Sequence, residues 1–306
     1  MKSIGVRNIK KVNHLNEFDE IEKIIQYNLC NRGLGKVKLY RQMEDCVNSL
    51  NLSNTIVIVT GFPVKSAGTG ETDGPPGALA LAYALQKLNK KAIIVTDKYS
   101  ESLIRAGAKT LQLSTEIYIF NEYKADEQAE EIIKKYKPGH IIAIERPGRS
   151  MDNKCYSMYG EDITDYCPNT DILFIKAKEN NISTSAVGDG GNELGMAKIK
   201  EIVKKNVNKG NIICARFETD NLIVAGVSNW GAFGICAGLS ILNDKSLMLN
   251  EDKYEEVMKE IIKAGAVDGC SKKRELSVDG ISYEENLIIF NKLKKLTERE
   301  RRKSFT

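Results

Sequence analysis

Short apolar runs rich in β-branched residues alternate along the chain with amphipathic stretches. An apolar run of roughly four to eight residues between turn signals predicts a buried strand. Such runs lie at 55–62, 92–97, 116–121, 140–145 and 183–189. Amphipathic or proline-opened stretches predict helices at 75–90, 100–108, 125–137, 170–181 and 192–207. The segment 212–226 predicts two more strands, joined by a turn at Glu218–Asn221.

This alternation predicts an α/β fold, a mostly parallel sheet with helices on both faces in a Rossmann-like three-layer arrangement. We expect one domain over residues 1–306, with helical attachments at about 1–50 and about 250–306. Sheets of this kind bind ligands beyond the carboxyl ends of their strands. The loops that follow the strands are therefore where a functional site is expected.

Charge and composition narrow the class of protein. The net charge is +4, but residues 292–306 alone carry +5, so no nucleic-acid-binding surface is expected on the rest. The most membrane-like stretch, 231–242, is shorter than the roughly 18 apolar residues of a spanning helix, and no secretory signal is visible. Seven cysteines without a CxxC pair and two histidines leave no material for a zinc cluster and indicate free thiols. We therefore expect a cytoplasmic protein without membrane contact.

Three of the loops after predicted strands combine glycines with acidic side chains. Their carboxylates are Glu71 and Asp73 in loop 61–78, Glu145 at the end of strand 140–145, and Asp189 and Glu193 in loop 187–197. We expect all five at one edge of the sheet. Unpaired carboxylates repel one another unless a cation lies among them, and oxygen ligands of this kind suit Mn²⁺ or Mg²⁺. The pattern therefore predicts a divalent-metal site.

Each of these loops also has a structural alternative. Asp73 is placed to cap a helix, and Asp189, Asn192 and Glu193 could form an acidic N-cap box. Glu145 is placed to pair with Arg146 or with a lysine. The single tryptophan, Trp230, is either a core aromatic or a pocket wall. Two Asp-Gly pairs, at 268 and 279, are typical of turns.

Other cofactors and nucleophiles have little support. Glu193 stands where the dinucleotide-binding fingerprint requires glycine, and the chain contains no GxxxxGK[ST] phosphate loop, so we expect neither NAD nor a flavin. A GxSxG nucleophile motif is also absent from the sequence. His140 begins a predicted strand, at the end of the sheet away from the expected site, so a structural role is expected for it.

The motifs together resemble the D-glutamate cyclase family. They are TGFPV from Thr60, ETDGPPGA from Glu71, ERPG from Glu145, GDGGNELGMA from Gly188, SNWGAFG from Ser228, AGAVDG from Ala264 and SVDG from Ser277. The resemblance runs from about Arg32 to Tyr283 and corresponds to the C-terminal domain of the two-domain mitochondrial enzyme of vertebrates. It departs from the family at Ala197, where the family has glycine. We expect a stand-alone domain without a transit peptide.

The resemblance implies an enzyme, a lyase that converts D-glutamate to 5-oxo-D-proline and water. A divalent ion would polarise the γ-carboxylate, and Glu145 or Glu193 would take the proton of the amine. The predicted substrate-binding residues are Lys65, Arg146, Asn192 and Trp230.

Two further functions remain open on the residues alone. Clustered carboxylates also serve Mn²⁺- or Mg²⁺-dependent phosphatases, here one acting on a small phosphorylated metabolite. The third is a metabolite- or metal-binding protein without catalysis. In each case the expected partner is a small molecule, and a homo-oligomer is possible.

Overall fold

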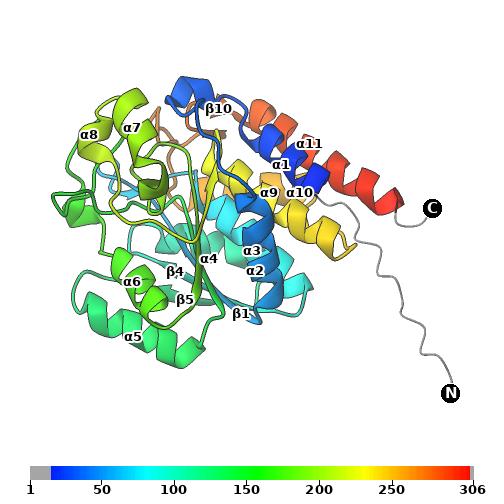
Figure 1. The fold of residues 1–306 in the computed structure, drawn as a ribbon, viewed down its shortest axis with the longest axis horizontal. Helices are drawn as coiled ribbons and strands as arrows, with labels where there is room; N and C mark the ends of the chain where they lie inside the picture. The colour runs from blue at the N-terminus through cyan, green and yellow to red at the C-terminus, as the bar shows by residue number, and fades with distance from the viewer. Residues whose placement is uncertain (1–14, 304–306) are drawn as a thin grey trace, which may run out of the picture.

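Six parallel strands form the centre of the protein in the computed structural model, which describes residues 15–303 (Figure 1). They are β1 (Thr55–Thr60), β4 (Lys91–Thr96), β5 (Glu116–Ile119), β6 (His140–Ile144), β7 (Ser183–Gly188) and β8 (Asn221–Val224). Their order across the sheet is β5-β4-β1-β6-β7-β8, and all neighbouring strands run parallel. The order reverses direction between β1 and β6, where α/β sheets of this topology open a crevice for ligands.

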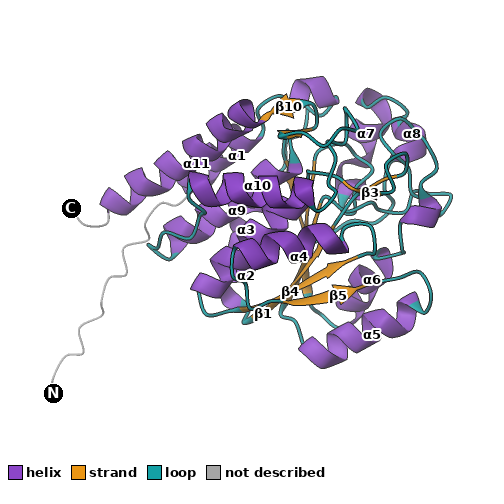
Figure 2. Ribbon diagram, turned by 180° about the vertical axis from the view of Figure 1, so that it is seen from behind, coloured by secondary structure: helices purple, strands orange, loops and turns teal. Residues whose placement is uncertain are grey.

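Helices cover both faces of this sheet, as Figure 2 shows, which confirms the predicted fold class. Alternate side chains of β1 explain the two layers: Ile56 and Ile58 enter one core, and Val57 and Val59 enter the other. The first layer contains α1 (Leu15–Ile25), α2 (Gln42–Leu52), α3 (Pro75–Lys87), α4 (Glu101–Thr110), α9 (Ser228–Leu242), α10 (Glu251–Lys263) and α11 (Tyr283–Lys303). The second contains α5 (Ala125–Tyr136), α6 (Asp171–Glu179), a 3₁₀ turn η3 (Met196–Ile199), α7 (Lys200–Asn206) and α8 (Gly210–Ile213).

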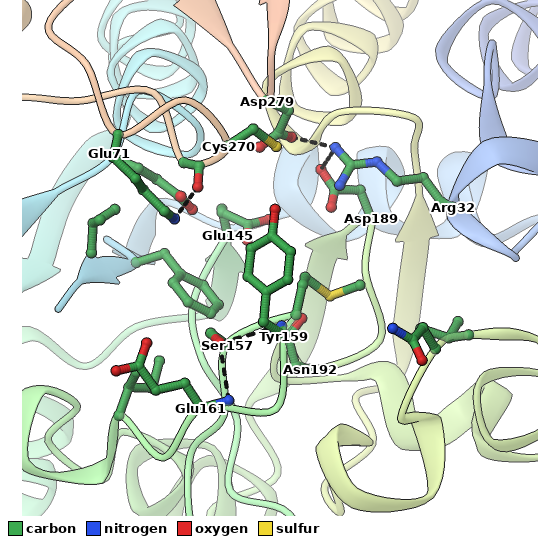
Figure 3. Close-up of a pocket in the computed structure, with 18 of the residues that line it drawn as sticks. Arg32, Glu71, Glu145, Ser157, Tyr159, Glu161, Asp189, Asn192, Cys270 and Asp279 are labelled. Carbon is green, nitrogen blue, oxygen red and sulfur yellow. Dashed lines mark hydrogen bonds and ion pairs between the residues drawn. The ribbon is translucent and has the colours of Figure 1, made fainter. Parts of the chain in front are cut away.

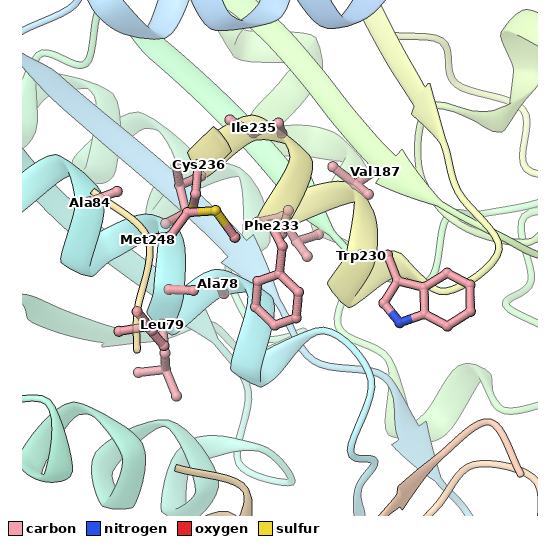
Figure 4. Close-up of a cluster of buried hydrophobic side chains, with 14 of the residues drawn as sticks. Ala78, Leu79, Ala84, Val187, Trp230, Phe233, Ile235, Cys236 and Met248 are labelled. Atoms are coloured by element: carbon pink, nitrogen blue, oxygen red, sulfur yellow. The ribbon is translucent and has the colours of Figure 1, made fainter. Parts of the chain in front are cut away.

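Helix α9 is the centre of the first layer. Nearly all of its residues are buried, as expected of a helix that is apolar all round. Phe233 packs edge-to-face against Tyr254 and Phe290, with ring centroids 5.1 and 5.2 Å apart. Figure 4 shows Phe233 beside Ala78 of α3 in the same buried cluster. The start of α9, at Ser228, consequently has a fixed position relative to the sheet.

Several short elements lie in the connecting segments. They are the helical turns η1 (Leu29–Arg32) and η2 (Thr164–Tyr166) and the two-stranded ribbons β2–β3 (Pro63–Val64, Thr69–Gly70) and β9–β10 (Ser277–Val278, Ile281–Ser282). The terminal attachments meet where α1 lies beside α11, linked by an Arg299–Glu20 ion pair of 2.6 Å (Figure 1). The predicted attachments before Leu15 and after Lys303 lie outside the described residues. Among residues 15–303, none of the helices combines the length and apolarity that crossing a membrane requires.

The predicted helix at 192–207 is wrong over its first turn. Helical structure begins only at Met196, as η3, and continues as α7. The residues before it form a turn because the Glu193 side chain accepts hydrogen bonds from three preceding backbone N–H groups. Gly195 has a φ of 98°, which interrupts regular helix geometry at the next step.

The predicted pair of strands at 212–226 is half wrong. Only β8 forms, and the residues before it include the short helix α8. The apolar run reads like a strand, but its backbone pairs with loops: Ala215 N–H donates to Gly191 O at 3.1 Å, and Arg216 N–H to Arg149 O at 2.8 Å. This segment therefore braces the loops at the carboxyl edge of the sheet rather than extending the sheet.

Candidate active site

Asp73 lies in the loop between β3 and α3, buried against the start of α9. Its Oδ1 accepts the backbone N–H of Asn229 at 2.8 Å, and its Oδ2 accepts that of Ser228 at 2.9 Å. Asp73 thus caps a helix, although the helix is α9 and not the α3 that follows it in sequence. The positive end of α9 stabilises negative charge at this position.

Glu145 follows the last residue of β6 and is buried. Its φ of 43° places a non-glycine residue in the left-handed region, an uncommon conformation that turns the chain sharply at the end of the strand. Its Oε2 accepts the hydroxyl of Ser228 at 2.6 Å. A β-carbon at Gly74 would lie 2.7 Å from the Glu145 β-carbon, so the close approach of the two loops requires glycine there.

Asp189 and Glu193 share the turn after β7 but point to different partners. Asp189 Oδ2 accepts the same Ser228 N–H as Asp73, at 3.1 Å. Glu193 accepts the N–H groups of Asp189, Gly190 and Gly191 at 2.5 to 2.7 Å. Glu193 therefore occupies the concave backbone turn that would otherwise attract an anion, and it fixes the position of Asp189.

Three of the five predicted metal ligands converge. Asp73, Glu145 and Asp189 each offer an oxygen, and these oxygens all lie within 4.8 Å of one another. Asp73 lies in the loop before α3, Glu145 directly follows β6, and Asp189 directly follows β7. The start of α9 contacts all three carboxylates through Ser228. The crevice between β1 and β6 thus holds the site that the strand order predicts.

A cavity of about 540 Å³ opens above this cluster (Figure 3). Glu71, Glu145, Asp189 and Asp279 line it, so Glu71 lies in the same cavity as the converging carboxylates. Tyr159 and Ser157, from the long loop after β6, form another part of the lining.

Burial and mutual repulsion act on the carboxyl groups of the cluster. Burial raises the pKa of Asp73 to about 7, and the Asp279 carboxylate adds to the effect. Burial also raises the pKa of Glu145 well above its usual range, with further repulsion from Glu193 and Asp73. The pKa of Asp189 is raised by burial as well, although Arg32 opposes the shift. Carboxyl groups at such close range protonate unless a cation lies among them, and an all-oxygen set of ligands could hold Mn²⁺ or Mg²⁺.

Arg32 and Asp279 line the cavity but were not predicted as site residues. The Arg32 guanidinium, carried by η1, forms ion pairs with Asp279 and, at 3.4 Å, with Asp189. Asp279 was predicted only as part of a turn, and its φ of 56° agrees with one. Both residues lie outside the strand–helix alternation, so the rule that located the other carboxylates did not include them.

The predicted substrate-binding residues separate into two pairs. Lys65 and Asn192 line the cavity. Arg146 is fully buried elsewhere: its guanidinium pairs with Asp97 and donates to Gly61 O at 3.0 Å, Thr170 Oγ1 at 3.1 Å and Pro168 O at 3.2 Å. Trp230 is also buried, and its indole N–H donates to Asn286 Oδ1 at 2.8 Å. The alternative Glu145–Arg146 pair does not form, since Arg146 is paired with Asp97.

The fold and the cavity define an α/β protein with a buried carboxylate site at the switch point of its sheet. The chain matches the family model described as D-glutamate cyclase-like, C-terminal, over residues 21–294, and it belongs to this family. It is 34% identical over 248 residues to the human protein D-glutamate cyclase, mitochondrial. This match spans 76% of the chain but only 40% of the human protein. The cytoplasmic location expected from the sequence stays a prediction.

A solved structure is also similar in part. It is an exopolyphosphatase-related protein from Bacteroides fragilis, with a TM-score of 0.44 and 12% identity, and the match covers 88% of this chain and 62% of that one.

Proposed function

We propose that the protein is a lyase that removes water from D-glutamate and forms 5-oxo-D-proline. The convergence of Asp73, Glu145 and Asp189 beside a cavity, in a member of the D-glutamate cyclase-like family, is the observation that carries this proposal. The reaction joins the α-nitrogen to the carbon of the γ-carboxyl group and breaks one of the two carbon–oxygen bonds of that group. The two protons that the ammonium group loses leave with the departing oxygen as water, so no co-reactant is needed.

The same three carboxylates would hold a divalent ion, Mn²⁺ or Mg²⁺, and Glu71 lies in the same cavity. Bound there, the ion would act as a Lewis acid on the γ-carboxylate of the substrate. Glu193 is an unsuitable ligand because three backbone N–H groups already surround its two oxygens. We assign it the role of positioning Asp189.

Glu145 is the base that the geometry favours of the two predicted from the sequence. It lines the cavity, where its carboxylate would take up a proton from the amine and return it to the leaving oxygen. The Ser228 hydroxyl fixes one of its oxygens. Because the nitrogen and the γ-carboxyl carbon belong to one substrate molecule, the remaining task of the cavity is to hold the curled conformer in which they meet.

The test is a paired assay on purified protein stripped of metal. D-glutamate, L-glutamate and a panel of phosphate esters are each incubated with and without Mn²⁺ or Mg²⁺, and 5-oxoproline and phosphate are measured. We expect 5-oxo-D-proline from D-glutamate only when metal is present. We also expect Asp189→Asn to lose this activity. Asp252→Asn, the control at an exposed carboxylate, should keep it. Phosphate release instead, or no product from any substrate, would contradict the proposal.

A further inference from the structure

Three cationic side chains line the cavity in the described part of the chain: Arg32, Lys65 and Lys272. The two lysines lie at its exposed rim. The Lys65 ammonium group donates to Asp162 O at 3.0 Å and lies 3.5 Å from Glu161, and the Lys272 ammonium group donates to Gly269 O. The Arg32 side chain is only 18% exposed and reaches the carboxylates themselves. Only Arg32 therefore brings positive charge to the depth where the candidate ligands converge.

Arg32 is fixed there by both its backbone and its side chain. It ends η1, and the next residue, Gly33, has a φ of 78° at a point where the chain lies against the backbone of Asn206. Its Nε donates to Gly226 O at 3.2 Å, and its Nη2 donates to Asp189 and Asp279. Within residues 15–303, Nη1 of Arg32 has no hydrogen-bond partner. A guanidinium group held on one side retains donors for an anion on the other.

The shape of the reacting substrate specifies where such a donor has to lie. Closure of a five-membered ring brings the nitrogen to the γ-carboxyl carbon, and the α-carboxylate is attached to the carbon that carries this nitrogen. The α-carboxylate must then lie beside the point where the γ-carboxylate is activated. Arg32 meets this condition because its Nη2 lies 3.4 Å from Asp189, one of the three converging carboxylates. Arg146, the arginine expected from the sequence, is enclosed by other partners.

We propose that Arg32 binds the α-carboxylate of the substrate through Nη1, and so selects amines that carry a carboxylate on the same carbon. This inference rests on the proposed function. The competing explanation is structural: Arg32 would only neutralise Asp189 and Asp279 and would make no contact with the substrate.

A ligand without the α-carboxylate separates these explanations. 4-Aminobutanoate is D-glutamate with that group removed. Dissociation constants of both ligands are measured by calorimetry on Mn²⁺-loaded wild type, Arg32→Gln and Arg32→Lys, together with kcat and KM for D-glutamate. A hydrogen-bonded ion pair of this kind is worth a factor of about 10 to 100 in binding. We expect Arg32→Gln to weaken the binding of D-glutamate by that factor and to change the dissociation constant of 4-aminobutanoate by less than about threefold. In turnover of D-glutamate, the substitution should raise KM more than it lowers kcat. Arg32→Lys should restore part of the difference.

The matched control is Arg105→Gln, which removes an exposed arginine that pairs with Glu101 outside the cavity and should keep the preference for D-glutamate. Lys65→Gln removes another cavity cation and tests the competing assignment. If Arg32→Gln weakens the binding of both ligands equally and also lowers the affinity for Mn²⁺, the role of Arg32 is structural and the inference is overturned. Loss of the preference in Lys65→Gln instead would assign the α-carboxylate to Lys65. Absence of D-glutamate binding and turnover in wild type would overturn the proposed function itself, so the two failures are distinguishable.

Discussion

Asp73 and Asn229 cap each other's helices. Asp73 accepts the Asn229 N–H at the start of α9, and the Asn229 side-chain oxygen accepts the Gly77 N–H, at 2.8 Å, in the first turn of α3. A β-carbon at Gly77 would lie 2.7 Å from that of Ala232, so glycine permits the close packing of the two helix starts. The position of a candidate metal ligand is thus fixed by the junction of two buried helices.

Asn229→Ala should therefore affect both stability and metal binding. The substitution removes the cap of α3 and leaves the buried Thr72 carbonyl without the Asn229 amide that donates to it. We expect a loss of about 1 to 3 kcal/mol in the free energy of unfolding, measured by urea denaturation, and weaker Mn²⁺ binding. Asn250→Ala is the control, since Asn250 caps the distant helix α10 at an exposed position. Asn250→Ala should lower the free energy of unfolding by about 1 kcal/mol and leave the affinity for Mn²⁺ unchanged. Equal metal affinity in both variants would contradict the coupling.

Gly74 and Gly68 provide a second matched pair. Both have positive φ, 94° and 63°, so alanine is strained at either position. At Gly68 the added carbon meets nothing within 4 Å, whereas at Gly74 it meets Glu145. We expect Gly68→Ala to lower the free energy of unfolding by about 1 kcal/mol and to leave the affinity for Mn²⁺ unchanged. Gly74→Ala should lower the free energy of unfolding by more and reduce the affinity for Mn²⁺ steeply. Calorimetric titration with Mn²⁺ measures this, and unchanged affinity in Gly74→Ala would refute the predicted displacement of Glu145.

Removal of one carboxylate should stabilise the protein when metal is absent. A carboxyl group whose pKa is raised in the folded state stabilises that state at low pH, and this contribution is lost as pH rises through the folded pKa, about 7 for Asp73. In EDTA at pH 8, above the folded pKa of Asp73, the charged Asp73 carboxylate repels its acidic neighbours. We expect Glu145→Gln to raise the free energy of unfolding by about 1 to 3 kcal/mol there, and to lose this advantage in Mn²⁺.

The control for this prediction is Glu256→Gln, which changes an exposed carboxylate on α10. It should stay within about 0.5 kcal/mol of wild type in both conditions. A metal-free Glu145→Gln that is less stable than wild type at pH 8 would show that the cluster is not under electrostatic strain.

His140 should make the protein sensitive to acid independently of the site. Burial lowers its pKa to about 3, and its ring lies between the hydroxyls of Ser49 and Ser185, at 2.8 and 3.0 Å. Protonation therefore favours the unfolded state, so stability falls as pH drops below about 6.5, by up to about 1.4 kcal/mol per pH unit. His140→Gln removes this dependence. Urea denaturation from pH 7.5 to 5 should show the stability advantage of wild type shrinking, and a constant difference would contradict the assignment.

The sheet was predictable because its strands are buried on both faces and read as continuous apolar runs, as in Ile56–Val59. The segment 212–216 has the same composition but pairs with loops, and no local signal distinguishes the two cases. Composition specifies burial, whereas the backbone partner depends on distant residues such as Arg149.

The site was predictable to the extent that it follows the strand-end rule. Asp73, Glu145 and Asp189 each follow a strand of the sheet or its attached ribbon, and they meet. Glu193 follows the same rule, but its carboxylate turns back to its own backbone, a local geometry that the spacing of glycines did not reveal. Arg32 belongs to the N-terminal attachment and reaches the cavity only through the tertiary fold.

We propose that Asp73, Glu145 and Asp189 together hold one divalent metal ion. Anomalous diffraction from crystals of the protein grown with saturating Mn²⁺ is the decisive experiment. We expect a strong anomalous peak within about 2.5 Å of a carboxylate oxygen from each of the three residues. A peak at other residues only, or none in the cavity at saturating Mn²⁺, would contradict it.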